Sequence, residues 1–317
     1  MTPAGSSRPP ASRGPAFPET PCPMRYFGKT QSGTDFGKIP PSQPDRARID
    51  TPSSRPTFPI GNGLSDYPPY RHRSKARLNV GAGMLQQFGE EIWTVDGPTV
   101  SVAGFAYPTR MIVIRLSDGA LFVWSPTALS GELRAAIDSL GPVQHIVAPN
   151  TLHHMFVGEW QSAYPAAQSH AVPALRTKRP DLKWDRDLED APAPEWSNDI
   201  EQVVVGGNRI TTEVVFFHRA SRTAIFTDLI QHFEPGWFKG WRAIVAQLDF
   251  LTAIRPTVPR KFRMTFRDRE VARRAVQRIM AWPTAAVLTA HGAPIRSGGQ
   301  VAIAHAFDWL LREKASR

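Results

Sequence analysis

Four side chains that can bind a metal or transfer a proton lie in three short segments of this 317-residue chain. These residues are His153, His154, Asp228 and His291. Each segment follows an apolar run that predicts a buried β-strand. The three runs are His145–Ala148, Thr223–Phe226 and Ala285–Thr289. Ligand sites of open α/β sheets collect where strands end, so we expect the four side chains to meet at one edge. Three imidazoles and a carboxylate suit a divalent metal such as zinc, iron or manganese.

The charge distribution divides the chain into two parts. Residues 1–83 hold 15 of the 30 prolines and carry twelve basic and five acidic residues. Residues 84–317 carry 26 basic and 23 acidic residues, so most of the net charge of +10 lies in the first part. Because the longer part is close to neutral, we expect no nucleic acid as a partner.

Residues 1–83 have no helical or strand periodicity, and we expect a disordered tail. Three interpretations stay open: a basic tail that contacts an acidic partner, a passive tail, or translated sequence upstream of a true start at Met84. The chain has one cysteine, Cys22, which excludes an internal disulfide and a thiolate metal cage. We therefore expect a cytoplasmic protein. No apolar run is long enough to span a membrane, so we expect no membrane partner.

Residues 84–317 predict one domain in which strands and helices follow each other. Two short strands are expected at Glu91–Val95 and Thr99–Val102, around a turn at Asp96-Gly97-Pro98. Further strands are expected at Arg110–Leu116, Ala120–Trp124, His170–Val172, Ile200–Val205 and Ile210–Phe217. Helices are expected at Ser130–Leu140, His154–Tyr164, Pro235–Leu248, Arg267–Trp282 and Gly299–Arg312. This order gives two β-rich halves, each flanked by helices. It favours a four-layer αββα sandwich of the α+β or α/β class over a doubly wound fold.

Two other clusters have mainly structural interpretations. Trp237, Phe238 and Trp241 lie at helical spacing, which is typical of core packing. Basic residues gather between Arg255 and Arg269, and we expect a solvated surface there, with anion binding as the alternative. The sequence contains no glycine-rich phosphate loop, so we expect no nucleotide cofactor.

The motifs Asn150…His153-His154, Thr227-Asp228 and His291-Gly292 resemble, in order and spacing, those of the metallo-β-lactamase fold. Glyoxalase II and ribonuclease Z share this fold. Residues 198–233 closely resemble an uncharacterised family within it, domain of unknown function 4336. The segments Arg115–Gly119, Val147–Asn150 and Phe266–Arg269 do so too. The resemblance covers residues 84–317 and implies a four-layer sandwich without an established activity.

The resemblance also implies that one of two metal sites is lost. The superfamily's first site takes three histidines, and Asn150, Leu152 and Arg209 stand near those places here. Its second site corresponds to His153, His154, Asp228 and His291. We therefore expect one divalent metal, zinc first, with iron or manganese as alternatives. Four protein ligands would close a zinc ion, whereas a catalytic ion needs an open position, which one non-ligating imidazole would provide.

Each candidate residue also has a structural interpretation. A histidine pair often starts a helix, Asp228 can cap a turn, and His291-Gly292 can form a tight turn. We place Asn150, Glu213 and His218 behind the ligands, where they would orient them. Glu213 and His218 lie five residues apart on one predicted strand, so only one can face the site. The alternative pairs Glu213 with a basic residue, Arg209 or Arg222.

Three functions follow as hypotheses. The first is a mononuclear metal-dependent hydrolase of a small-molecule ester, thioester or lactone, with His153 and Asp228 as catalytic residues and the free histidine of the pair as general base. The second is a catalytically inactive binding or assembly module with the same fold. The third is a metal-dependent oxidoreductase. The sequence does not indicate an oligomeric state.

Overall fold

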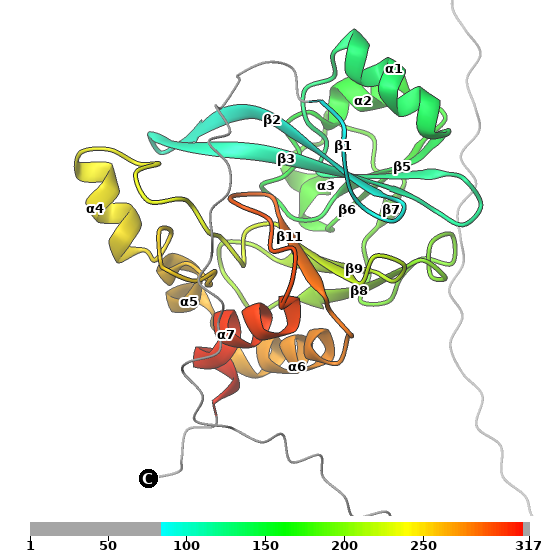
Figure 1. Ribbon diagram of the computed structural model, residues 1–317. Coiled ribbons are helices and arrows are strands. Elements are labelled where there is room, and N and C mark those ends of the chain that lie inside the picture. Colours follow the sequence, from blue (N-terminus) through cyan, green and yellow to red (C-terminus); the bar gives the residue numbers. More distant parts are fainter. Residues whose placement is uncertain (1–83, 313–317) are drawn as a thin grey trace, which may run out of the picture. The chain divides into compact units, whose positions relative to one another are not determined.

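The computed structural model describes residues 84–312 of the chain, and the predicted tail at residues 1–83 lies outside this range (Figure 1). The first sheet has seven strands in chain order. They are β1 (Gln86–Gly89), β2 (Ile92–Val102), β3 (Phe105–Arg115), β4 (Leu121–Trp124), β5 (Val143–Ala148), β6 (Gln168–Ala171) and β7 (Arg186–Asp187). Strands β1 to β4 pair antiparallel, and β4 to β7 pair in parallel.

The second sheet has four strands in the order β11-β10-β9-β8. They are β8 (Ile200–Val205), β9 (Glu213–His218), β10 (Thr223–Phe226) and β11 (Ala286–Thr289). Strands β8, β9 and β10 are antiparallel, whereas β11 runs parallel to β10. The loops after β10 and β11 therefore leave the sheet at the same edge.

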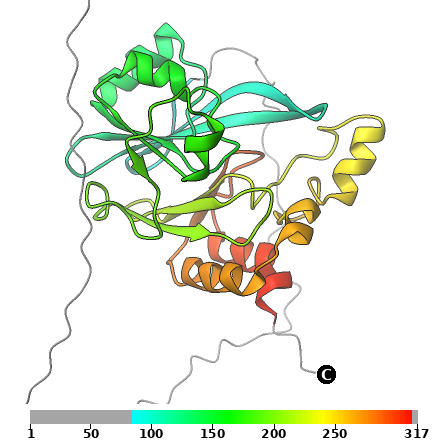
Figure 2. The same cartoon turned by 180° about the vertical axis from the view of Figure 1, so that it is seen from behind.

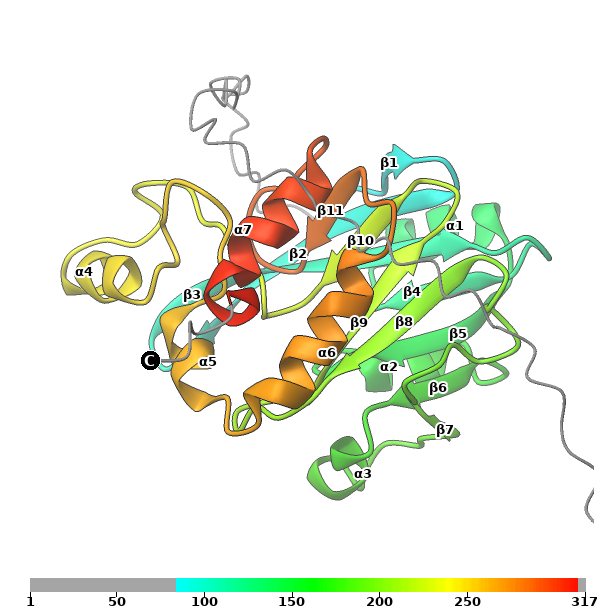
Figure 3. The same cartoon turned by 90° about the horizontal axis from the view of Figure 1, so that it is seen from below.

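Helices cover the outer faces of both sheets (Figures 1 and 2). On the first sheet lie α1 (Gly131–Leu140), α2 (Val157–Ala163) and α3 (Ala174–Lys178). On the second lie α6 (Arg269–Met280) and α7 (Gly299–Leu311), as Figure 3 shows from below. Helices α4 (Trp241–Leu248) and α5 (Arg260–Thr265) lie at one end of the molecule. The layers are helix, sheet, sheet, helix, so the predicted αββα sandwich is confirmed.

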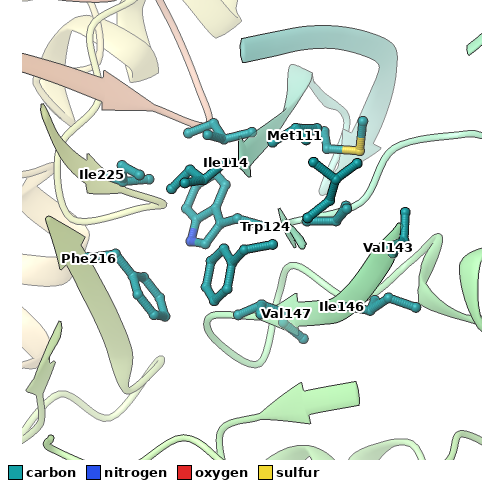
Figure 4. Packing of buried hydrophobic residues seen from close by; sticks show 14 of the residues in the cluster. Met111, Ile114, Trp124, Val143, Ile146, Val147, Phe216 and Ile225 are labelled. Carbon is teal, nitrogen blue, oxygen red and sulfur yellow. The ribbon is translucent and has the colours of Figure 1, made fainter. Parts of the chain in front are cut away.

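The core between the two sheets explains why β9 has no exposed residue. Along this strand, Val214 and Phe216 pack toward the first sheet, while Val215 and Phe217 pack with α6 and α7. A strand covered on both faces consists of apolar residues almost throughout, as β9 does. Figure 4 shows Phe216 in this core, where its ring packs edge to face with Phe122 of the first sheet, with centroids 5.6 Å apart. Both side chains are fully buried.

Two predicted elements differ most clearly from the structure. The predicted turn at Asp96-Gly97-Pro98 is a bulge inside β2, because β2 and β3 keep pairing on both sides of it, from Asp96 with Arg110 to Thr99 with Pro108. The helix expected from Pro235 begins only at Trp241, since Gly236 and Gly240 both have positive φ and interrupt the helical path. Among residues 84–312, no helix combines the length and apolar character needed to cross a membrane.

Candidate metal centre

Three loops carry His153, Asp228 and His291 to one place. They follow β5, β10 and β11, so they come from both sheets. Nε2 of His153 lies 3.3 Å from Oδ2 of Asp228, and Nε2 of His291 lies 3.4 Å from Oδ1 of the same carboxylate. The three side chains are only 7–8% exposed. One ligand atom from each residue lies within 4.8 Å of the other two.

The spacing of these atoms fits one divalent metal ion. Ligand atoms bound to a tetrahedral zinc at about 2.0–2.2 Å lie about 3.3–3.6 Å from one another. The two nitrogen–oxygen distances fall in this range, each to a different oxygen of the Asp228 carboxylate. Lone pairs of two neutral imidazoles that face a carboxylate repel it unless a cation or protons lie between them. The three residues can therefore hold a metal and leave a position open for water or substrate.

A backbone carbonyl oxygen fixes the orientation of the His291 ring. Its Nδ1 donates to the carbonyl oxygen of Pro108 at 2.7 Å, so Nε2 is the nitrogen that faces Asp228. The next residue, Gly292, has φ +104°, and a Cβ there would lie 2.0 Å from the carbonyl oxygen of His232. Arg110 donates to the carbonyl oxygens of Thr289 and Gly292 on either side of the ring. This turn therefore requires glycine and orients His291.

His153 is held by the loop that follows β4. Its Nδ1 lies 2.8 Å from Oγ of Ser125, which has a positive φ of 50°. A non-glycine residue rarely adopts this conformation, and it aims the hydroxyl at the ring. When Nδ1 donates to the hydroxyl, Nε2 is free for a metal. Burial lowers the pKa of His153 more than the Asp228 charge raises it, which favours the neutral ring.

Asp228 is fixed by two amide side chains. Asn150 Nδ2 donates to Oδ2 at 2.7 Å, and Gln231 Nε2 donates to Oδ1 at 3.2 Å. The Asn150 carbonyl accepts the backbone N–H of His153, so one amide positions two loops. Burial raises the pKa of Asp228, but the two facing histidines together outweigh this effect and hold the pKa well below its usual value. The carboxylate is therefore ionised and oriented.

Glu213 holds the loop that carries Asp228 through hydrogen bonds to its backbone. Its buried carboxylate accepts the backbone N–H groups of Thr227, Asp228 and Leu229 at 2.8–3.1 Å. Burial and the Asp228 charge raise its pKa to about 7 despite these bonds. The sequence analysis expected Glu213 to contact either a ligand imidazole or a basic residue, but its partners are these backbone N–H groups. The reason is local, because the N–H groups of the turn after β10 point at the first residue of β9.

The structure places two other candidates away from the three ligands. His218 lies at the opposite end of β9 from Glu213, where its Nδ1 contacts the Ser221 hydroxyl at 2.8 Å. Nδ1 of His154 lies 2.9 Å from an Arg179 guanidinium nitrogen, outside the group of three. Since arginine only donates, this nitrogen accepts and His154 Nε2 carries the proton. His153, Asp228 and His291 therefore form the group that could hold a metal ion, and His154, the fourth expected ligand, lies outside this group.

The three ligands lie in the wall of a cavity of about 740 Å³. Most of the wall is apolar, contributed by the β2–β3 hairpin, the loop after β5, α4 and α5. Lys261 adds a positive charge, with Nζ 3.0 Å from the Tyr107 hydroxyl. The Tyr107 ring packs edge-on against His291. The open position can therefore receive a molecule that combines an apolar part with a polar or anionic part.

Sequence reasoning did not identify several residues that shape this centre. Ser125, Gln231, Arg110 and Tyr107 belong to no recognisable motif, and their roles depend on partners at least 28 residues away or on a local turn. The basic cluster that includes Lys261 was interpreted as solvated surface. Lys261 instead lies in the cavity wall. This position agrees with anion binding, the alternative that the sequence analysis gave for the cluster.

Solved structures with a similar fold are metallo-β-lactamases. The DIM-1 enzyme exposed to ceftazidime has a TM-score of 0.53 and 12% identity, over 73% of this chain and 97% of that chain. The TMB-1 enzyme has a TM-score of 0.52 and 10% identity, over 73% and 98%. The enzyme from Pontibacter korlensis has a TM-score of 0.50 and 12% identity, over 73% and 100%. A search of the curated proteins found no match.

The described domain therefore has the metallo-β-lactamase fold. A family model described as "Domain of unknown function (DUF4336)" matches residues 89–236. The matched segment includes β2 to β10 with His153 and Asp228, while His291 follows it in the chain. The shared fold and this match assign no activity to the chain.

Proposed function

We propose that this protein is a hydrolase that uses one divalent metal, held by His153, Asp228 and His291. The observation that carries the proposal is the convergence of three oriented ligand atoms in the wall of an open cavity. Two histidines and one carboxylate are the protein ligands of several zinc hydrolases, in which the remaining position takes water. Zinc is the first choice, and the same ligands also suit iron(II) or manganese.

The chain's own groups have separate tasks in this proposal. When bound, the metal would lower the pKa of a water molecule and polarise a carbonyl group. Pro108 and Ser125 hold the two rings with Nε2 toward the carboxylate. Asn150 and Gln231 keep both oxygens of Asp228 aimed at the rings. This pre-orientation lowers the cost of ordering the site when metal and substrate bind.

His154 acts as a hydrogen-bond donor in this proposal rather than as the general base. The Arg179 guanidinium occupies the lone pair of its Nδ1, so the ring can only donate from Nε2. His154 lines the same cavity as the ligands and can donate to an oxygen of the substrate. This assignment replaces the general-base role suggested by the sequence.

The substrate class follows from the cavity wall. Apolar residues of β2, β3 and α4 accommodate a hydrocarbon chain, and Lys261 with Arg260 attracts a negative charge. We infer an ester, thioester or lactone that carries an apolar acyl group and an anionic group. A catalytically inactive binding module would use the cavity alone. It would not require the hydrogen bonds from Asn150 and Glu213 that build the Asp228 loop.

Metal analysis of the full chain, expressed without a polyhistidine tag, tests the proposal. The parent should contain about one metal per chain, and the Asp228→Ala variant should contain almost none. Asp249→Ala is the matched control, because Asp249 is a cavity carboxylate outside the ligand group and should leave the metal content unchanged. Circular dichroism checks that all three proteins fold.

Turnover is then measured with acyl esters, thioesters and lactones of increasing chain length, with and without a chelator. We expect activity that requires metal and disappears in Asp228→Ala. Activity that survives both chelation and this substitution would overturn the hydrolase mechanism. A parent that binds no zinc, iron(II) or manganese would favour the binding module instead.

A further inference from the structure

Helix α4 turns its bulky apolar side chains toward solvent. Trp241, Ile244 and Leu248 are 58%, 63% and 59% exposed, whereas Ala246 is fully buried. Residues three and four positions apart share one face of a helix, so these side chains form a continuous stripe with Val245. A surface helix of a globular protein normally has the opposite arrangement, with bulky apolar residues toward the core. The apolar stripe is therefore available to a partner.

The stripe is held in place by the neighbouring β2–β3 hairpin (Figure 1). Arg242 Nε donates to the carbonyl oxygen of Gly104 at 2.7 Å. Trp237 Nε1 donates to that of Ala106 at 2.9 Å. The rings of Phe105 and Trp241 meet edge to face, with centroids 5.7 Å apart. Helix and hairpin thus form one unit, and the exposure of α4 is a property of the packed domain.

The exposed apolar surface continues to the mouth of the metal-centre cavity. Twelve large apolar residues are strongly exposed in the part of the chain that the structure describes, and seven of them line this cavity. They come from five separate segments, represented by Val102, Met155, Ile210, Leu248 and Met264. Such a concentration at one place marks an interaction surface rather than the scattered exposure of an ordinary monomer.

The same region carries the basic charge of the domain. Residues 234–263 contain six basic and two acidic residues, a net charge of +4. The remainder of residues 84–317 contains 20 basic and 21 acidic residues, a net charge of −1. An apolar stripe on a basic segment complements a partner that is apolar and negatively charged.

Charge argues against two occupants from the protein itself. Residues 1–83 carry a net +7, and a second copy in a symmetric pair would bring the same +4 face against itself. Both arrangements place like charges together. A bilayer with anionic headgroups offers negative charge at its surface and hydrocarbon directly beneath, which is the environment that interfacial amphipathic helices occupy.

We propose that α4 and the cavity mouth dock on an anionic lipid surface. The stripe of Trp241, Ile244 and Leu248 enters the headgroup boundary, and the basic residues around it contact the headgroups. In this position the cavity opens toward the lipid. Docking requires no membrane-spanning run, so it replaces the expectation of no membrane partner drawn from the absence of such a run. It does not depend on metal in the site.

Sedimentation of the full chain with lipid vesicles tests the proposal. We compare vesicles of phosphatidylcholine mixed with phosphatidylserine with vesicles of phosphatidylcholine alone. The parent should partition onto the mixed vesicles much more strongly, and high salt should weaken this partition. Ile244→Glu should lower the partition at least about tenfold. It removes an aliphatic side chain that docking would bury in the lipid, and it adds a negative charge that the anionic headgroups repel.

Val301→Glu is the matched control, since Val301 is an aliphatic residue of α7 that is 53% exposed and lies outside the wall of the metal-centre cavity. It should bind vesicles like the parent. Equal binding by parent and Ile244→Glu would assign vesicle binding to another basic segment and overturn the proposal. A parent that ignores both kinds of vesicle would overturn it too. A dimer of the parent that dissociates on the Ile244→Glu substitution would also overturn the proposal, because the stripe would then bind a second copy.

Discussion

The molecule contains two buried histidine clusters that differ in what surrounds the rings. In one, His153 and His291 face the carboxylate of Asp228 in the wall of a cavity. In the other, Nδ1 of His145 lies 3.2 Å from Nε2 of His170, and both rings pack against Trp196. The second pair satisfies its facing nitrogens internally and has no carboxylate ligand in the structure described.

The contrast between the two clusters shows that residue type alone does not define a metal centre. Burial disfavours the charged form in both clusters and lowers the pKa of His153 and of His170, the latter to about 4. Only the first cluster also contains an anion that faces two ring nitrogens. A cation between these groups relieves their repulsion, whereas a cation beside His145 and His170 would meet two neutral rings and an indole.

The largest effect is expected from removing one imidazole in each cluster. His153→Ala removes one of three ligands and should weaken metal binding at least about a thousandfold, or about 4 kcal/mol. His145→Ala should leave metal affinity unchanged and lower only the stability of the fold. Titration of the apo variants with zinc measures both effects. Equal loss of affinity in the two variants would remove the distinction between the clusters.

The buried ring of His170 should make the domain less stable in acid. The unfolded ring titrates near 6.5, and in the fold burial, followed by the neighbouring His145, lowers the pKa to about 4. Between these values the unfolded chain binds more protons, so stability falls as the pH drops from 6.5 to 4 and then levels off. We expect this ring to contribute a loss of about 3 kcal/mol.

Urea unfolding of the parent and His170→Gln at several pH values measures this contribution. The variant lacks the titrating ring, so between pH 6.5 and pH 4 its free energy of unfolding should fall less than that of the parent. A difference that stays constant from pH 7 to pH 4 would contradict the buried neutral pair.

Metal should stabilise the domain through the first cluster only. A ligand present at a hundred times its dissociation constant raises the free energy of unfolding by about 2.7 kcal/mol. We expect zinc to raise the melting temperature of the parent and of His145→Ala, and a chelator to reverse the change. Asp228→Ala should melt at the same temperature with and without zinc. A zinc effect that persists in this variant would place the metal elsewhere.

The smallest expected effect is the loss of metal affinity when Asn150 is replaced, compared with replacement of Asn208, whose side chain forms a similar turn. Asn150→Ala should weaken metal binding about 10- to 100-fold, because the side chain orients Asp228 without binding the metal. Asn208 accepts the N–H of Ile210 and donates to the carbonyl oxygen of Phe262, away from the ligands. Asn208→Ala should cost stability and leave zinc affinity unchanged. Calorimetric titration of both variants measures the contrast, and equal affinities would show that Asn150 only shapes its loop.

Much of the fold was predictable because periodic patterns act locally. The two apolar faces of β9 and the amphipathic pattern of α6 follow from spacing, and both elements are in the structure where the sequence predicts them, with β9 starting later than expected. The helix expected at Pro235 begins later because glycine conformations at Gly236 and Gly240 prevail over the pattern. The β2 strand passes through a predicted turn because its partner strand continues past it.

The four-layer order and the short list of polar residues at strand ends follow from the sequence, because strand periods, helix periods and turn residues depend on neighbouring positions. Which of those polar residues meet depends on the tertiary structure. His153 and His154 are adjacent in the chain, yet one ring faces Asp228 and the other faces Arg179. Likewise, α4 has an ordinary amphipathic pattern, and its outward orientation depends on contacts with a hairpin more than 130 residues earlier. Such choices depend on distant partners, which spacing along one chain does not specify.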